Sequence, residues 1–155
     1  MKKVLAVVIF QAIFFSLSHL PAGQASSSGG LDRNLIDAAG DGDTAQARQL
    51  LEKGANIEAK ETSGNTALIT AAEKGRAEMV KLLLDKGANI GAMNNFGDTA
   101  LIKAAEQGHS EVVKLVVEKG ANIEAKDNHG DTALQVAARK RKTELVTLMQ
   151  KKGAH

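Results

Sequence analysis

A 33-residue repeat constrains what this chain can fold into more than any other feature of its sequence. Residues 61–93 and 94–126 align without a gap and share 19 identical positions. The same register extends in both directions and gives four units, which begin near Ser28, Glu61, Asn94 and Asp127. A unit this short cannot bury its apolar face alone, and repeats of this length stack into a solenoid. The sequence therefore predicts a stack of four units.

Each unit carries the signals of two short helices joined by a turn. A threonine before the first apolar stretch can accept a hydrogen bond from a free N–H of the first helical turn. These threonines are Thr66, Thr99 and Thr132. Gly75 and Gly108 punctuate the end of this helix, since glycine tolerates the left-handed conformation found there, whereas the last unit has Arg141. A second apolar stretch follows and stops at a Gly-Ala-Asn segment, which leads into an extended turn.

Two blocks characterise the units, Gly-x-Thr-x-Leu-x-x-Ala-Ala and Leu-Leu-x-x-Gly-Ala-Asn. Together with the period of 33, they resemble the ankyrin repeat over residues 31–155. The usual Thr-Pro-Leu-His reads Thr-Ala-Leu-Ile twice and Thr-Ala-Leu-Gln once, which removes a Thr–His hydrogen bond and some turn rigidity. The resemblance implies an all-α ankyrin-repeat solenoid of four helix-turn-helix units with β-turn fingers. It also implies a protein-binding module with no cofactor and no reaction of its own.

The beginning of the chain reads differently from the repeats. Lys2 and Lys3 precede a 14-residue apolar stretch, and Gly23 and Ala25 supply small residues before a cleavage point. This layout predicts a signal peptide over residues 1–25. The apolar stretch is too short for a membrane anchor, which needs roughly 20 residues.

Removal of this leader leaves a predicted flexible linker over residues 26–30 and the repeat domain over residues 31–155. Without the two leader lysines, 18 basic residues balance 18 acidic ones. A neutral domain has no global field that would steer it to nucleic acid or an anionic membrane. The absence of cysteine excludes disulfides and thiol catalysis. We expect a monomeric bacterial protein in the periplasm, with secretion from the cell as the alternative.

The repeats offer no constellation of catalytic or metal-binding residues. The sequence has no Gly-x-Ser-x-Gly elbow, no His-Glu-x-x-His pair and no complete calcium loop. His109 follows Gly108 at the start of a second helix, where the resemblance implies a structural histidine. His129 lies at a turn tip and is expected to be solvated or to contact a partner. We therefore predict no enzyme activity, no metal and no cofactor.

One basic run stands out, over residues 139–142, with Lys151 and Lys152 near it in the sequence. It has no aromatic neighbours on which bases could stack, which argues against nucleic acid. A solvated face of the last unit is one interpretation, and a contact with an acidic patch on a partner is the other.

The resemblance implies partner contacts on a concave surface made of turn tips and the exposed side of each first helix. In the second unit this surface comprises Lys60, Thr62, Ser63, Asn65, Glu73 and Lys74. In the third unit it comprises Met93, Asn95, Phe96, Asp98, Glu106 and Gln107. In the fourth unit it comprises Lys126, Asn128, His129, Asp131, Arg139 and Lys140.

Phe96 is the residue of this surface that the fold does not explain. It is the only Phe, Tyr or Trp after the leader, and it sits at a turn tip where the neighbouring units have Ser63 and His129. It either folds back onto a neighbouring turn or contacts a partner. We predict that it anchors a partner, because central aromatic residues often dominate binding energy. Met93, three residues earlier, is expected to give it an adaptable apolar neighbour.

An exported binding module acts through what its binding does to a partner. We expect an inhibitor or self-protection protein that occludes a partner enzyme, such as a peptidoglycan-cleaving enzyme of the periplasm. One alternative is an accessory or stress protein that supports a periplasmic redox enzyme. The other is an exported effector that acts on another cell.

Overall fold

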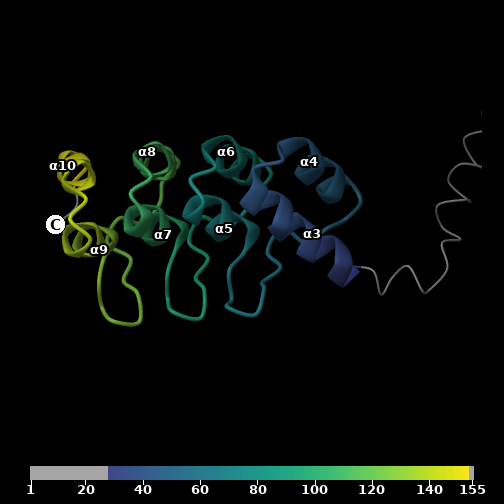
Figure 1. The fold of residues 1–155 in the computed structure, drawn as a ribbon, viewed down its shortest axis with the longest axis horizontal. Helices are drawn as coiled ribbons and strands as arrows, with labels where there is room; N and C mark the ends of the chain where they lie inside the picture. The colour runs from purple at the N-terminus through teal and green to yellow at the C-terminus, as the bar shows by residue number, and fades with distance from the viewer. Residues whose placement is uncertain (1–27, 154–155) are drawn as a thin grey trace, which may run out of the picture.

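The computed structural model describes residues 28–153, which form eight helices and no named strand. The helices alternate between two layers (Figure 1). The inner layer comprises α3 (Ser28–Asp41), α5 (Ala67–Glu73), α7 (Ala100–Gln107) and α9 (Ala133–Arg139). The outer layer comprises α4 (Thr44–Glu52), α6 (Ala77–Asp85), α8 (Ser110–Glu118) and α10 (Thr143–Lys151). This arrangement confirms the predicted all-α solenoid of four helix-turn-helix units.

The three later inner helices begin at the predicted threonines. The Thr66 hydroxyl accepts a hydrogen bond from the Ile69 N–H at 3.3 Å, and Thr99 repeats this contact one unit later. In the last unit the bonds are reciprocal: the Thr132 hydroxyl accepts from the Gln135 N–H, and the Gln135 side chain accepts from the Thr132 N–H. Each cap satisfies a helical N–H that would otherwise lack a partner. The threonines thus fix where each inner helix begins.

The core is a continuous apolar layer that runs between the helices and from one unit to the next. α5 packs against α3 on one side, α7 on the other and α6 within its own unit. The inner helices contribute alanine pairs with no exposed surface, Ala71-Ala72 and Ala104-Ala105. The outer helices contribute larger buried side chains, among them Met79, Leu83 and Val112. The alanine pairs allow the inner helices to stack closely, while each large buried side chain of either layer stabilises the fold by about 1.5–3 kcal/mol.

Side chains at the start of two outer helices bind the preceding unit. The His109 Nε2 atom lies 2.9 Å from the carbonyl oxygen of Glu73, the last residue of α5. One unit earlier, the Arg76 Nε atom donates a hydrogen bond to the Gly40 carbonyl at 3.0 Å. Both contacts occupy a carbonyl that the end of an inner helix leaves free. The structural role predicted for His109 is therefore confirmed.

The first helix is longer than the repeat pattern predicts. α3 begins at Ser28, so residues 28–30, which we expected in a flexible linker, form its first turn. Two glycines in this turn are poor helix formers, but Leu35 and Ile36 further along α3 are buried against the stack. Tertiary packing of such an apolar face outweighs local propensity. The predicted signal peptide, residues 1–25, and residues 26–27 of the linker lie outside the described residues.

The last unit adopts the turn after its inner helix without a glycine. Arg141 has a φ of 57°, where Gly75 and Gly108 have 71° and 90°. A side chain in this left-handed conformation costs about 1–2 kcal/mol. The stacking of α9 and α10 on the preceding unit must hold this turn against its local preference.

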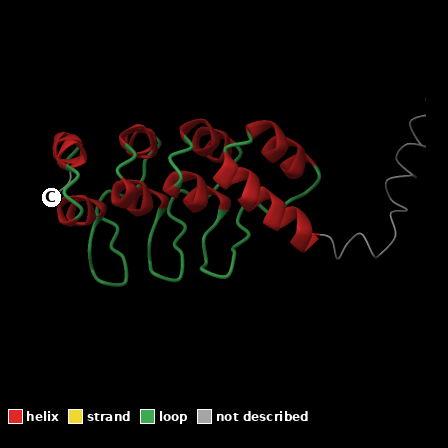
Figure 2. Cartoon of the chain, viewed as in Figure 1, coloured by secondary structure: helices red, strands yellow, loops and turns green. Residues whose placement is uncertain are grey.

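Three loops extend from the inner helices to the same side of the stack (Figure 2). We call them finger 2 (residues 60–65), finger 3 (residues 93–98) and finger 4 (residues 126–131). Each is a tight turn closed by backbone hydrogen bonds, such as Gly97 N–H to the Asn94 carbonyl at 3.1 Å. Neighbouring fingers are joined by a backbone bond at the tip, from the Asn128 N–H to the Phe96 carbonyl at 2.9 Å. The predicted β-turn fingers are therefore present, and they form a ladder.

The glycines at the finger tips allow this ladder to form. A Cβ atom added to Gly97 would lie 2.7 Å from the backbone nitrogen of Asn128 in finger 4. Gly130 occupies the same place in finger 4 with nearly the same φ, 83° against 79°, but a Cβ there would meet nothing within 4 Å. Substitution of Gly130 therefore measures the energetic cost of the turn conformation alone. Substitution of Gly97 adds the cost of a clash with the neighbouring finger.

We predict that Gly97→Ala lowers the free energy of unfolding by at least about 1 kcal/mol more than Gly130→Ala does. Both variants place a side chain at a positive φ, but only Gly97→Ala pushes on the neighbouring finger. Urea denaturation of the two variants and the parent chain measures the difference. Equal losses of stability would show that the fingers do not need this close approach.

Candidate partner-binding surface

The structure places most of the predicted partner-binding residues on the fingers and on the exposed side of the inner helices. The exposed ones are Lys60, Thr62, Lys74, Met93, Asn95, Phe96, Gln107, Lys126, Asn128, His129, Arg139 and Lys140. The half-buried ones are Ser63, Glu73, Asp98, Glu106 and Asp131. These residues form a surface available to a partner, while their part in binding stays a prediction.

Asn65 is a correction to this set, because its side chain is buried. Only 8% of Asn65 is exposed. Its Oδ1 atom accepts a hydrogen bond from Asn94 at 2.9 Å, and its Nδ2 atom donates to the Glu61 carboxylate at 2.9 Å. Because its amide oxygen and its amide nitrogen are both hydrogen-bonded, the Asn65 side chain joins fingers 2 and 3 and is not free to contact a partner.

Asn94, which the sequence analysis did not single out, organises finger 3. Its Oδ1 atom accepts hydrogen bonds from the N–H groups of Phe96 and Asp98, both at 2.9 Å. Asp127 holds finger 4 in the same way. An Asn or Asp that precedes a turn and binds the backbone ahead of it is a known turn signal. The pair Asn94 and Asp127, 33 residues apart, carried that signal in the sequence.

Fingers 3 and 4 enclose a groove of about 240 Å³ above α7 and α9, which we call the Phe96 groove. Its lining includes two apolar residues, Ile102 and Val136, which are both almost fully buried. Its walls are Phe96, Asp98, Lys103, Glu106, Asp127, His129 and Arg139. Phe96 is 58% exposed. The aromatic ring thus stays largely open to solvent beside a groove that is lined by charged groups.

Met93 does not share this groove with Phe96. It is 42% exposed and lines a separate cleft of about 90 Å³ with Ile90 and Ala121. Its backbone carbonyl accepts a hydrogen bond from Lys60 at 2.8 Å. Met93, which we expected to give Phe96 an adaptable apolar neighbour, is not among the residues that line this groove, because the two side chains line different hollows of the surface.

Lys103 on α7 was also missed, and it is the centre of the charges in the Phe96 groove. Its Nζ atom lies 2.9 Å from Glu106, 3.6 Å from Glu73 and 4.0 Å from Asp98. Its counterparts in the neighbouring units are Thr70 and Val136. No repeated feature could point to a residue that only one unit has.

This cluster shifts the pKa values of three groups. Burial raises the pKa of Asp98, although the hydrogen bond from Asn94 and the charge of Lys103 act in the opposite direction. The hydrogen bond from Lys103 lowers the pKa of Glu106. Burial works to lower the pKa of Lys103, but its bond to Glu106 and the surrounding carboxylates outweigh that effect and raise the pKa. Lys103 is thus committed mainly to Glu106, and the charge of Asp98 is poorly compensated.

The basic run of the last unit is partly paired. Arg139 forms an ion pair with Asp131, and Lys140 lies 3.5 Å from Glu106.

Among residues 28–153, no group of three His, Cys, Asp or Glu side chains is arranged to hold a metal ion. None of the helices in that range is both long and apolar enough to cross a membrane.

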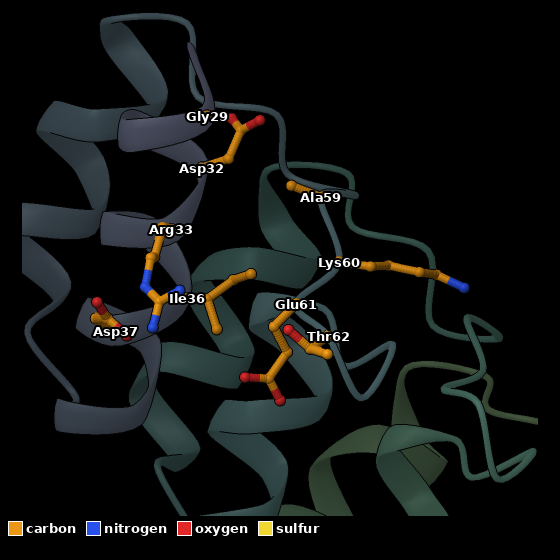
Figure 3. Close-up of a pocket in the computed structure, with 9 residues that line it drawn as sticks. All are labelled: Gly29, Asp32, Arg33, Ile36, Asp37, Ala59, Lys60, Glu61 and Thr62. Atoms are coloured by element: carbon orange, nitrogen blue, oxygen red, sulfur yellow. The ribbon is translucent and has the colours of Figure 1, made fainter. Parts of the chain in front are cut away.

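A second groove, of about 300 Å³, lies where α3 meets finger 2 (Figure 3). Asp32, Arg33, Ile36 and Asp37 line it from α3, and Glu61 and Thr62 line it from the other side. α3 stands where a finger would belong in the first unit, because the sequence there has no turn block. The groove was not predicted, since it depends on the length of α3.

The comparison with known proteins gives one family. A family model described as "Ankyrin repeats (3 copies)" matches residues 35–127 and, in a second overlapping match, residues 89–155. None of the curated proteins matches the chain.

The pKa shifts predict how stability depends on pH. Because folding lowers the pKa of Glu106, its ionised form stabilises the fold above the ordinary value of 4.5, and this contribution is lost as the pH falls through the folded pKa. Because folding raises the pKa of Asp98, its ionised form opposes folding. Asn65 shows that an amide is accepted at the corresponding position.

We therefore predict that Glu106→Gln lowers the free energy of unfolding by about 1 kcal/mol at pH 7. The loss should shrink as the pH falls below 4.5. Asp98→Asn, the matched control, should cause no loss at pH 7. Urea denaturation across this pH range measures both, and a loss for Glu106→Gln that does not change with pH would contradict the assignment.

Proposed function

The chain belongs to the ankyrin-repeat family, and from that premise we propose that it is an exported inhibitor that covers the active site of a partner enzyme. Ankyrin repeats are protein–protein interaction modules and generally have no catalytic activity. The proposed site of action is the bacterial periplasm, and the proposed partner is a peptidoglycan-cleaving enzyme. The main observation in support of the proposed binding surface is the exposed Phe96 ring, which lines a groove between two fingers.

The fold does not need an aromatic side chain at this position. The backbone of Phe96 provides the contacts to its neighbours, since its N–H binds Asn94 and its carbonyl binds Asn128. The corresponding residues, Ser63 and His129, are polar. An exposed ring with its backbone fixed loses little conformational entropy when it binds, which favours its use as an anchor.

Two features support blocking rather than another mode of action. The fingers are tied together by hydrogen bonds, so the surface is preorganised and needs little rearrangement to bind. The sequence pattern of residues 1–25 supports export. A rigid, exported surface without a reaction of its own acts by occupying a site on its partner, and an enzyme active site is the simplest such target.

We predict that Phe96→Ala weakens binding of the partner by about 2 kcal/mol, because it removes the aromatic anchor. Its thermal midpoint should remain close to that of the parent chain, because the ring is not part of the core. Calorimetric titration against the captured partner and thermal unfolding measure the two effects. Lys81→Ala, at an exposed position of the outer helix α6, is the control and should bind like the parent. Unchanged affinity of Phe96→Ala would remove this residue from the binding surface.

The inhibitor proposal predicts that a peptidoglycan-cleaving enzyme is captured from a periplasmic extract by the immobilised chain. Added in excess, the pure chain should abolish the activity of that enzyme in a turbidity assay, and Phe96→Ala should inhibit less. An unaltered rate in the presence of bound chain would rule out inhibition. Capture of a redox enzyme would favour an accessory role, and recovery of the protein only from the culture medium would favour an effector.

A further inference from the structure

Seven of the nine residues that line the Phe96 groove differ from their counterparts one unit earlier, and three of these changes bear on what the groove can bind. Phe96 replaces a serine, Asp98 replaces an asparagine, and Asp127 replaces an asparagine. The counterparts are Ser63, Asn65 and Asn94. The groove between fingers 3 and 4 thus has two carboxylates where the preceding unit has amides, and it also has two cations, Lys103 and Arg139, where the preceding unit has Thr70 and Glu106.

The fold does not account for the two negative charges. Asn94 holds finger 3 by accepting two backbone hydrogen bonds at its Oδ1 atom. The Asp127 Oδ1 atom accepts the same two bonds in finger 4, from His129 at 2.8 Å and Asp131 at 2.9 Å. An amide oxygen serves this purpose as well as a carboxylate does. The turn of finger 4 therefore does not require the second carboxylate oxygen of Asp127 or its negative charge.

The cations that line the groove are paired with other carboxylates. Lys103 is hydrogen-bonded to Glu106 at 2.9 Å and lies 4.0 Å from Asp98, and Arg139 is paired with Asp131. Within residues 28–153, the side-chain hydrogen bonds of Asp98 engage its Oδ2 atom and those of Asp127 its Oδ1 atom, which leaves the other oxygen of each carboxylate for a ligand. Burial raises the pKa of Asp98, and the hydrogen bond from Asn94 and the charge of Lys103 do not fully offset this effect.

We propose that the Phe96 groove receives an arginine side chain that projects from an extended segment of the partner protein. The guanidinium group is planar, so it can stack on the Phe96 ring while its N–H groups reach the carboxylates of Asp98 and Asp127. The apolar stem of the arginine then lies beside the exposed Phe96 ring. This inference rests on the proposed protein-binding function and specifies the residue type that the surface recognises.

The test uses two synthetic peptides, acetyl-Ala-Arg-Leu-amide and its citrulline analogue, which has almost the same shape and no charge. In ¹³C and ¹⁵N NMR titrations of the chain over residues 26–155, the arginine peptide should give saturable shifts of the Phe96 ring and of the Asp98 and Asp127 amides. The citrulline peptide should bind at least about fivefold more weakly, because the ion pairs are lost.

The matched variants are Asp98→Asn with Asp127→Asn, and Glu111→Gln with Glu118→Gln on α8. Each pair removes two negative charges, and the first pair introduces side chains that the preceding unit already has. Only the first pair of substitutions should weaken binding of the arginine peptide, again by about fivefold or more. The amide spectrum of each variant shows directly that it is folded.

Equal binding of the two peptides, equal binding to both pairs of variants, or no saturable shift at the groove would overturn the proposal. Capture of the partner enzyme distinguishes this failure from a failure of the proposed function. If Phe96→Ala abolishes capture and the Asp98→Asn, Asp127→Asn variant does not, the surface binds a protein but not through an arginine.

Discussion

The close approach of neighbouring units is the constraint on which the rest of this structure depends. A helix pair of this size cannot bury its own apolar face, so each unit is stable only against the next. Alanine pairs on the inner helices permit this approach in the core, and glycines such as Gly97 permit it at the finger tips. The fingers and the surface that they carry are regular because the stack is regular.

The repeated part of the structure could be predicted from the sequence because its signals recur in several units. The threonine caps and the glycine turns follow from local rules that recur along the repeats, and the structural role of His109 was implied by the ankyrin resemblance. The length of α3 was not predicted, because its first turn contains two glycines, which are poor helix formers. The repeat pattern cannot predict the structure of the first unit, because the sequence of that unit departs from the pattern.

The candidate site was only partly predictable, for a related reason. The resemblance places side chains on a surface by position alone, and it could not distinguish Asn65, which is buried, from exposed neighbours in the same finger. It also could not show that Met93 and Phe96 line different hollows. The contacts of Lys103 depend on the folded geometry, since they join residues of its own unit, Glu106 and Asp98, with Glu73 of the preceding unit. The differences between units, rather than their shared pattern, are the better guide to binding.

The central claim is that a partner binds on the fingers and inner helices around Phe96. Amide hydrogen exchange, measured by mass spectrometry with and without the captured partner, tests it most directly. The account predicts that the partner slows exchange in residues 93–98 and 126–131 and leaves the outer helices α6, α8 and α10 unchanged. Protection confined to those outer helices would contradict it.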